Sequence, residues 1–291
     1  MFYVRGWRRE RLCGAPSPGG LILEAGLSSR AKAAIAGAIL VLASGSTGFS
    51  QVELAQVELA QYATAPQPAE VDTALVVSVD VSNSVDEHRY RLQMEGIAKA
   101  LEDPKVLDAI LTGPRGSILF MMVTWSDRPQ IAVPWITIKS KADAAAAAEK
   151  VRKVPRQGGE FTCLAKMLRF VSDKVVTQVP VKAARLVVDV SGDGSDNCNP
   201  EEPSRVVRDE LVAANTVING LPILEGREAA TLAPWFVENV MGGPGSFVLP
   251  AEGYGDFGRA IKQKFVTEIS GISSQPSRYA LQPGARTDAR P

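Results

Sequence analysis

Oxygen-bearing side chains follow an apolar run near residue 75 at a regular spacing. The stretch ALVVSVDVSNS predicts a buried strand that delivers Asp80, Ser82 and Ser84 at every second position. Asp193 follows a second apolar run, in ARLVVDVSGDG, and Thr162 lies in a glycine-containing loop, RQGGEFTCLAKM, that opens a predicted helix. Two carboxylates and three hydroxyls are hard oxygen donors. They suit Mg²⁺, with Mn²⁺ or Ca²⁺ as alternatives.

The elements that must position these side chains alternate between strands and helices. GSILFMMVTWSD and QIAVPWITI, separated by the turn-like DRP, predict a hairpin whose second strand lies at an edge. Residues 245–251, GSFVLPA, are a further expected strand. Helices are expected over residues 85–103, 141–154, 162–176, 203–215 and 254–269. The pattern predicts an α/β fold with a doubly wound, mostly parallel sheet, one antiparallel edge strand and helices on both faces.

This architecture places the five side chains at one rim, because ligands of open parallel sheets bind at the carboxyl ends of the strands. A soft or imidazole metal site is not offered, since His88 is the sole histidine and belongs to the first predicted helix. Helix capping is the simpler alternative, because Ser and Asp are preferred N-caps and Ser84 precedes VDEH. Helix capping can account for any one of these residues, whereas a metal site accounts for the occurrence of all five at the same rim.

In this order the motifs resemble the von Willebrand factor type A domain, with TVINGLPIL and GGPGSFVLP pointing to an uncharacterised branch of bacterial exported proteins. The resemblance implies a domain over residues 73–270 and a metal-ion-dependent adhesion site. Asp80, Ser82 and Ser84 would form its first loop, Thr162 its second and Asp193 its third. It also implies a non-enzymatic module that binds a protein partner, whose carboxylate completes the metal shell.

An enzymatic alternative starts from GDGSDN, which resembles the acidic loop of haloacid-dehalogenase-type phosphatases. In that interpretation Asp80 is a covalent nucleophile and Asp193 a magnesium ligand. The chemistry needs a general-acid carboxylate two residues after the nucleophile, where this chain has Ser82, and a basic residue, for which Lys166 is the nearest candidate. We therefore expect a binding module and keep the phosphatase as the alternative.

Composition and the N-terminal segment bear on partners and location. Lys plus Arg and Asp plus Glu both number 32 among 291 residues, a balance that argues against a general nucleic-acid binder. RAKAAIAGAILVLASGSTGFSQ has the layout of a secretory signal, so residues 1–50 are expected to be a leader cleaved near Ser50. Residues 51–72 are expected to be a flexible spacer and 271–291 a disordered tail. The mature protein should be periplasmic or secreted, with no stable membrane span.

Two further expectations concern a cysteine pair and a carboxylate within a buried strand. Of the three cysteines, Cys13 lies in the expected leader, which leaves Cys163 beside Thr162 and Cys198 just beyond Asp193. A pair in an exported protein predicts a disulfide between the second and third loops, with two free thiols as the alternative. Asp189 interrupts a buried strand and needs a partner, for which Ser78 of the first strand is the candidate.

Overall fold

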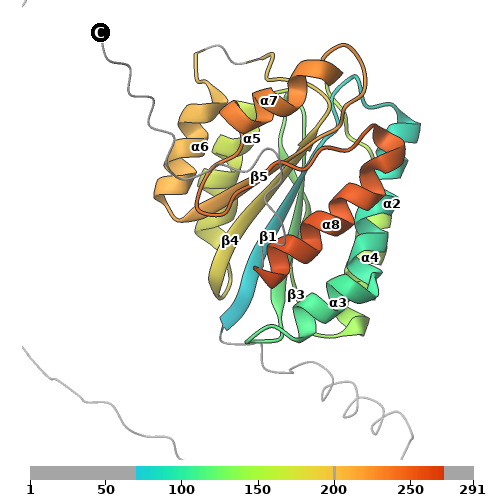
Figure 1. Cartoon of the computed structure of the whole chain (residues 1–291), viewed down its shortest axis with the longest axis vertical. Helices are drawn as coiled ribbons and strands as arrows, with labels where there is room; N and C mark the ends of the chain where they lie inside the picture. The colour runs from blue at the N-terminus through green and yellow to red at the C-terminus, as the bar shows by residue number, and fades with distance from the viewer. Residues whose placement is uncertain (1–69, 199–200, 272–291) are drawn as a thin grey trace, which may run out of the picture. The chain divides into compact units, whose positions relative to one another are not determined.

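A single five-stranded sheet with helices on both faces forms the structure. The computed structural model describes residues 70–198 and 201–271. The strand order is β3-β2-β1-β4-β5, and the pairs β1–β2, β1–β4 and β4–β5 are parallel. The doubly wound, mostly parallel sheet is therefore confirmed (Figure 1). The expected leader, nearly all of the spacer and the tail beyond Gly271 lie outside the described residues.

The strands and helices alternate along the chain. The strands are β1 (Glu70–Asp80), β2 (Ile118–Trp125), β3 (Gln130–Ile138), β4 (Lys182–Gly192) and β5 (Thr216–Pro222). The first helices are α2 (Glu87–Glu102), α3 (Pro104–Leu111), α4 (Lys141–Arg152) and α5 (Leu164–Phe170). Helix α5 continues into a π-helical turn (Val171–Val175) and a 3₁₀ turn (Val176–Gln178). The remaining helices are α6 (Ser204–Ala213), α7 (Ala229–Asn239) and α8 (Phe257–Ser270), the last preceded by a 3₁₀ turn (Tyr254–Asp256).

Two apolar clusters cover the two faces of the sheet, because successive side chains of a buried strand point to opposite sides. Leu75, Val77 and Val79 of β1 pack with α2, α3, α4 and α8. Val76 belongs to the other cluster, together with side chains of α5, α6 and α7 (Figure 1). The near-continuous apolar run of β1 thus reflects burial on both faces.

Strand β3 is the antiparallel edge strand that the sequence predicted. It pairs with β2, and its burial alternates irregularly, whereas every residue of β2 is buried. Pro134 lies within β3, a position that an edge strand tolerates because one side of it makes no ladder hydrogen bonds.

Two segments differ from the expected elements. Residues 245–251 form isolated parallel bridges beside β5, such as Gly220 with Val248, instead of a full strand; Pro250 supplies no N–H for a continuous ladder. Strand β1 begins at Glu70, inside the range expected to be spacer. Arg115 and Lys182 bind the carboxylate of Glu70 at 2.8 Å each and so hold this first residue in the sheet.

The expected Ser78–Asp189 pairing is wrong. Val77 is the register partner of Asp189, so Ser78 points to the opposite face of the sheet. The side chain of Asp189 faces α8 instead, where its Oδ1 lies 3.3 Å from Nζ of Lys264. Sequence reasoning missed this partner because Lys264 lies in a helix far along the chain.

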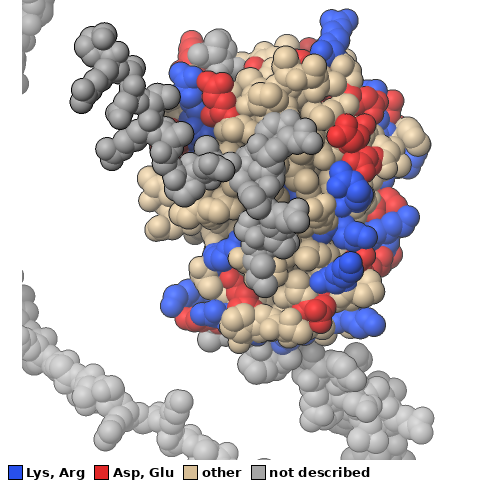
Figure 2. Space-filling model, viewed as in Figure 1, with Lys and Arg blue, Asp and Glu red and all other residues tan. Residues whose placement is uncertain are grey.

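Charges of both signs are interspersed on the surface seen in Figure 2. On α4, for example, Arg152 binds Glu95 and Glu102 of α2 and Glu149 of its own helix. This mixed surface fits the balanced composition. None of the helices within residues 70–198 and 201–271 is long and apolar enough to cross a membrane.

Candidate metal-ion site at the carboxyl ends of the strands

The first loop of the site begins where β1 ends. Asp80 is fully buried, and its Oδ1 accepts a hydrogen bond from the backbone N–H of Ser82 at 2.7 Å. Gln93 of α2 donates to the backbone carbonyl of Asp80 at 3.2 Å and ties the loop to the helix that follows. Ser82 is buried and Ser84 is exposed, so the loop runs from the core to the surface. Asp86, and not Ser84, caps α2.

Hydroxyl groups connect this loop to the other two. Ser82 Oγ lies 3.2 Å from Ser84 Oγ and 3.4 Å from Thr162 Oγ1. Ser84 Oγ donates to Asp193 Oδ1 at 2.7 Å. The structure thus brings together all five residues that the sequence singled out, although they come from three separate segments of the chain.

The electrostatics of Asp80 are those of a carboxylate that lacks a counterion. Burial, and secondarily the negative charge of Asp193, raise the pKa of Asp80 to about 7. Its Oδ2 is buried and has no hydrogen-bond partner within the described residues. Gly192 of β4 faces this oxygen, and a Cβ there would approach it to 3.2 Å. Buried polar atoms almost always have partners, so an unpaired carboxylate oxygen at this rim fits the role of a cation ligand.

The second and third loops are held together covalently. Cys163 and Cys198 form a disulfide with a Cα–Cα distance of 5.2 Å, which confirms the predicted bridge. Asn197 forms two further hydrogen bonds between these loops. Its backbone N–H donates to the carbonyl of Thr162, and its side-chain Oδ1 accepts from the N–H of Thr162, both at 3.0 Å. Asp196 accepts from the N–H of Ala165 at 2.7 Å and fixes the start of α5. The position of Thr162 is therefore set by the third loop.

Three side chains at the same rim escaped sequence reasoning. Arg89 of α2 donates to the carbonyl of Ser84 at 2.5 Å and binds Glu225 at 2.6 Å. Its guanidinium also lies 5.3 Å from the ring centre of Tyr254, whose N–H donates to Glu225. Arg89 could have been noticed from its place five residues after Ser84. No local pattern connects Tyr254 with the first loop.

The hydroxyl of Tyr254 is buried beside the two carboxylates. Burial first, and then the charges of Asp193 and Asp80, raise the pKa of its phenol. The negative charge of Asp193 acts on the hydroxyl, yet within the described part of the chain the hydroxyl has no hydrogen-bond partner. It therefore lies where it could donate to Asp193 if that carboxylate turned toward a bound cation.

Replacing Tyr254 with Phe is expected to weaken Mg²⁺ binding by roughly 10-fold to 100-fold, the usual loss when a group that orients a metal ligand is removed. The stability of the metal-free protein should not fall, because the hydroxyl lost is an unpaired one. Calorimetric titration and thermal unfolding measure the two effects. Tyr90→Phe is the matched control: its buried hydroxyl donates to the carbonyl of Val154 at 2.9 Å, away from the site. That control should lose about 1 kcal/mol of stability and keep its Mg²⁺ affinity.

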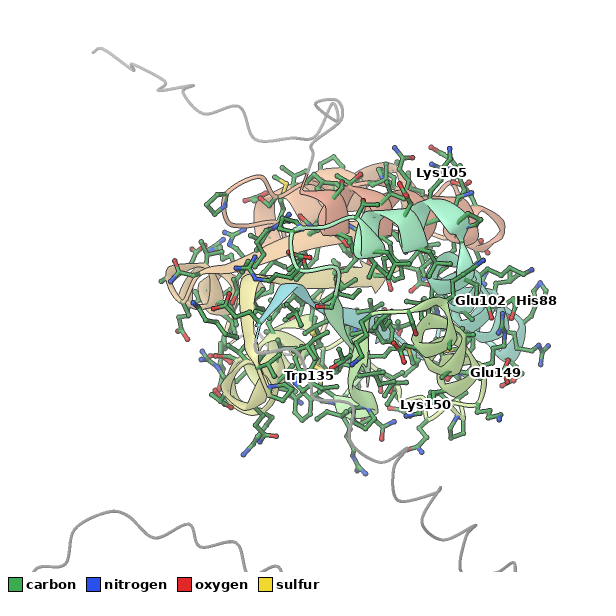
Figure 3. All side chains as sticks on the ribbon, turned by 90° about the horizontal axis from the view of Figure 1, so that it is seen from below. His88, Glu102, Lys105, Trp135, Glu149 and Lys150 are labelled. Carbon is green, nitrogen blue, oxygen red and sulfur yellow. A yellow bond between two sulfur atoms is a disulfide. The ribbon has the colours of Figure 1, made fainter. Side chains whose placement is uncertain are left out.

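Other polar residues considered from the sequence lie outside the site. His88 projects from α2 at the periphery of the molecule and is exposed (Figure 3). Lys166 is exposed on α5. The described residues contain no group of three or more His, Cys, Asp or Glu side chains that could hold a metal. A cation at this rim would therefore depend on the hydroxyls as well as on Asp80 and Asp193.

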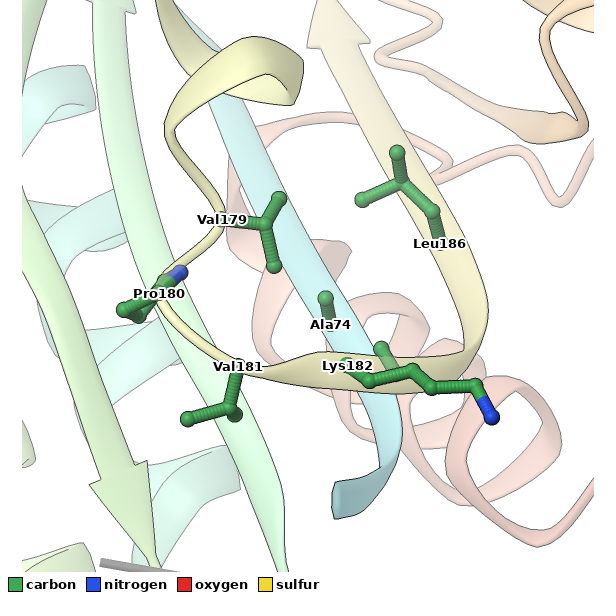
Figure 4. Close-up of a pocket in the computed structure, with 7 residues that line it drawn as sticks. Ala74, Val179, Pro180, Val181, Lys182 and Leu186 are labelled. Atoms are coloured by element: carbon green, nitrogen blue, oxygen red, sulfur yellow. The ribbon is translucent and has the colours of Figure 1, made fainter. Parts of the chain in front are cut away.

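A pocket at the other end of the sheet is chemically different. It has a volume of about 380 Å³ and is lined by Ala74 of β1, by Leu186 of β4 and by the segment that leads into β4 (Figure 4). Its lining is mostly aliphatic, with Lys182 at its margin. Because these residues lie near the amino-terminal ends of the strands, the pocket is remote from Asp80 and plays no part in the candidate site.

The fold defines the class of protein. Among solved structures, proximal thread matrix protein 1 from the mussel byssus, with a zinc-occupied MIDAS motif, is similar with a TM-score of 0.51 and 16% identity over 70% of this chain and 50% of that one. The von Willebrand factor domain of the type V pili tip protein Mfa5 from Porphyromonas gingivalis has a TM-score of 0.50 and 10% identity, over 71% of this chain and 98% of that one. The chain thus has the fold of a von Willebrand factor type A domain, and it spans about half the length of the mussel protein.

Within this class the family is defined by sequence. Residues 70–273 match the family described as protein of unknown function DUF1194, and the chain belongs to that family. No curated protein sequence matches the chain.

Proposed function

We propose that this protein is an exported, non-enzymatic binding module that recognises a protein partner through a divalent cation, Mg²⁺ first among the candidates. The observation that carries the proposal is the fully buried Asp80, whose Oδ2 is unpaired where hydroxyls from separate loops converge. Asp80, Ser82, Ser84, Thr162 and Asp193 are the proposed ligands. The zinc-occupied MIDAS motif of the mussel protein supports the assignment by analogy of fold.

The number of ligands leaves room for a group from a partner. Five side-chain oxygens leave one of the six positions of an octahedral Mg²⁺ shell open, and the two carboxylates bring no more negative charge than the ion's own two positive charges. When bound, the cation would supply an electrophilic position that a carboxylate of the partner can occupy. Arg89 lies at the same rim, although Glu225 already engages one of its nitrogens. An acidic side chain of a protein is therefore the proposed partner group; nucleic acid is not proposed.

The phosphatase alternative gains no support from the geometry. Ser82, which cannot serve as a general acid, occupies the position two residues after Asp80. Lys166 is exposed on α5, where the alternative would need a basic group in the site. The oxidised Cys163–Cys198 pair favours an exported location, since disulfides persist in oxidising compartments.

The test of this proposal is a calorimetric titration of the protein with Mg²⁺, Mn²⁺ and Ca²⁺, run beside a phosphate-ester hydrolysis assay in Mg²⁺. Saturable binding of one cation per chain without hydrolysis supports the binding module. Hydrolysis that disappears in Asp80→Asn would promote the phosphatase, and absence of any cation binding would refute the metal assignment.

Mg²⁺ binding should depend on pH in a direction set by Asp80. Its pKa in the metal-free fold is about 7, and a cation binds the carboxylate form, so binding must release the proton below that pH. The Kd for Mg²⁺ is expected to rise by up to about tenfold for each pH unit below 7 and to level off above about pH 8. Titrations in two buffers with different heats of protonation also measure the released proton. An affinity that stays constant between about pH 5.5 and pH 8 would contradict the role given to Asp80.

A further inference from the structure

A second cluster of ionisable side chains lies between the sheet and α8. Lys264 of α8 is fully buried, and its Nζ lies 3.3 Å from Asp189 Oδ1 and 3.1 Å from Glu268 Oε1. Asp189 and Glu268 are both 1% exposed. These distances fit ion pairs, but no residue of the described part of the chain completes a hydrogen bond to Nζ or to either oxygen of Asp189. One amine therefore lies beside two carboxyl groups in a site that is buried from bulk solvent.

The neighbours of the cluster form a hydrogen bond to the carboxyl group of Glu268 but none to that of Asp189 within the described residues. Asn219 of β5 donates to Glu268 Oε1 at 2.8 Å, and the N–H of Phe247 fixes the amide of Asn219 at 2.9 Å. The ring of Phe247 covers Nζ, with its centre 4.3 Å away. Glu268 is thus anchored, whereas Asp189 faces Nζ without a hydrogen bond.

Burying three charged groups in this way lowers the stability of the fold. Removing an ion from water costs several kcal/mol even in real proteins, and a pair recovers that cost only when its remaining polar atoms are hydrogen-bonded. Among the residues that the structure describes, Nζ, both oxygens of Asp189 and Oε2 of Glu268 have no hydrogen-bond partner. A reaction that removes two of the charges would lower the free-energy cost of burying these groups.

We propose that Lys264 and Asp189 form an intramolecular isopeptide bond that joins α8 to β4. Transfer of the ammonium proton within the pair first gives a neutral amine and a neutral carboxyl group. The nitrogen lone pair then attacks Cγ of Asp189, the C–N bond forms, and the C–OH bond breaks. Glu268 takes a proton from nitrogen and returns it to the departing hydroxyl, so the products are one amide and one water molecule. No oxidant, reductant or co-reactant is consumed.

Placement and burial account for the choice of electrophile and for the driving force. Burial, together with the nearby charge of Glu268, raises the pKa of Asp189 well above its ordinary range, which favours the neutral carboxyl form that an amine can attack. Glu268 keeps its place as proton carrier through Asn219. Fixing the reacting groups within contact distance replaces a bimolecular step by an intramolecular one, which can correspond to a very high effective concentration. Loss of the released water molecule to the solvent shifts the equilibrium toward the amide.

Peptide mapping of the folded, wild-type protein tests the bond directly. After reduction and alkylation of the cysteines, trypsin should fail to cleave at Lys264. The peptide of residues 186–205, which contains Asp189, should appear joined to residues 263–278. The intact mass of the reduced protein should be lower, by one water molecule, than the mass calculated for the sequence that begins at its measured N-terminus. An intact mass that shows no loss of water, with cleavage at Lys264, would overturn the proposal, and so would a bond from Lys264 to Glu268.

Two variants add a control to this measurement. Glu268→Gln keeps the shape of the proton carrier but not its basicity, and it should reduce the cross-linked fraction at least tenfold. Lys262→Met alters a lysine of the same helix that is partly exposed and paired with Asp103. It should retain the full cross-linked fraction. An equal fraction in Glu268→Gln would remove Glu268 from the step, and the wild-type map decides the bond even if that variant does not fold.

Discussion

Asp80→Asn is expected to reduce Mg²⁺ affinity by more than about 100-fold. Removing a group that only supports a metal ligand costs up to about 100-fold, and Asp80 is proposed to be a ligand itself. The substitution keeps the size of the side chain and takes away the charge that the proposed cation would neutralise. Calorimetric titration measures the effect, and Asp108→Asn is the control. Asp108 is an exposed carboxylate on α3, so its loss should leave the Mg²⁺ affinity unchanged.

The same variant should be more stable than the wild type when metal is absent. The folded protein holds the pKa of Asp80 at about 7 instead of 3.8, so the stability that this group contributes is fully present below pH 3.8 and is lost as the pH rises through 7. The difference corresponds to roughly 4 kcal/mol as an upper bound. In denaturant unfolding near pH 8 with a chelator, the Asp80→Asn variant should unfold at a higher denaturant concentration than the wild type. A variant that is less stable and binds Mg²⁺ as before would contradict both halves of the prediction.

Loss of the Cys163–Cys198 disulfide is the second large effect that we expect. Replacing both cysteines with Ala should cost roughly 3–4 kcal/mol of unfolding free energy, because the bridge closes a loop with a sequence separation of 35. The cost arises chiefly from the greater freedom of the unfolded chain in the chain-entropy account. Urea unfolding of the oxidised wild type and the double variant measures it.

The bridge also joins the loop that carries Thr162 to the loop that follows Asp193. Mg²⁺ affinity should therefore fall in the double variant even under conditions where its fold is intact. Cys13→Ala provides the control, since Cys13 lies in the expected leader; it should change neither stability nor affinity. Two free thiols per chain in the denatured, unreduced protein would show that the bridge does not form in solution.

The local pattern of the sequence determined most of the fold. Unbroken apolar runs such as residues 74–79 predict strands buried on both faces, and the half-polar run with Pro134 predicts an edge strand. Both follow from short-range chemistry, because burial and backbone hydrogen bonding act on each strand separately. The positions of Asp80, Ser82 and Ser84 at a strand end were predictable for the same reason. So was the pairing of Cys163 with Cys198, once both were expected to lie on neighbouring loops.

Only the tertiary structure decided which distant groups meet. The parallel register of β1 with β4 turns Asp189 away from Ser78 and toward Lys264, and a shift of one residue would have reversed that outcome. The turn before α8 brings Tyr254 to the rim of the first loop, although most of the domain lies between them in the sequence. The unpaired Oδ2 of Asp80 likewise results from burial by several segments. Such contacts depend on how whole elements pack, and a sequence pattern reports only the neighbours of a residue along the chain.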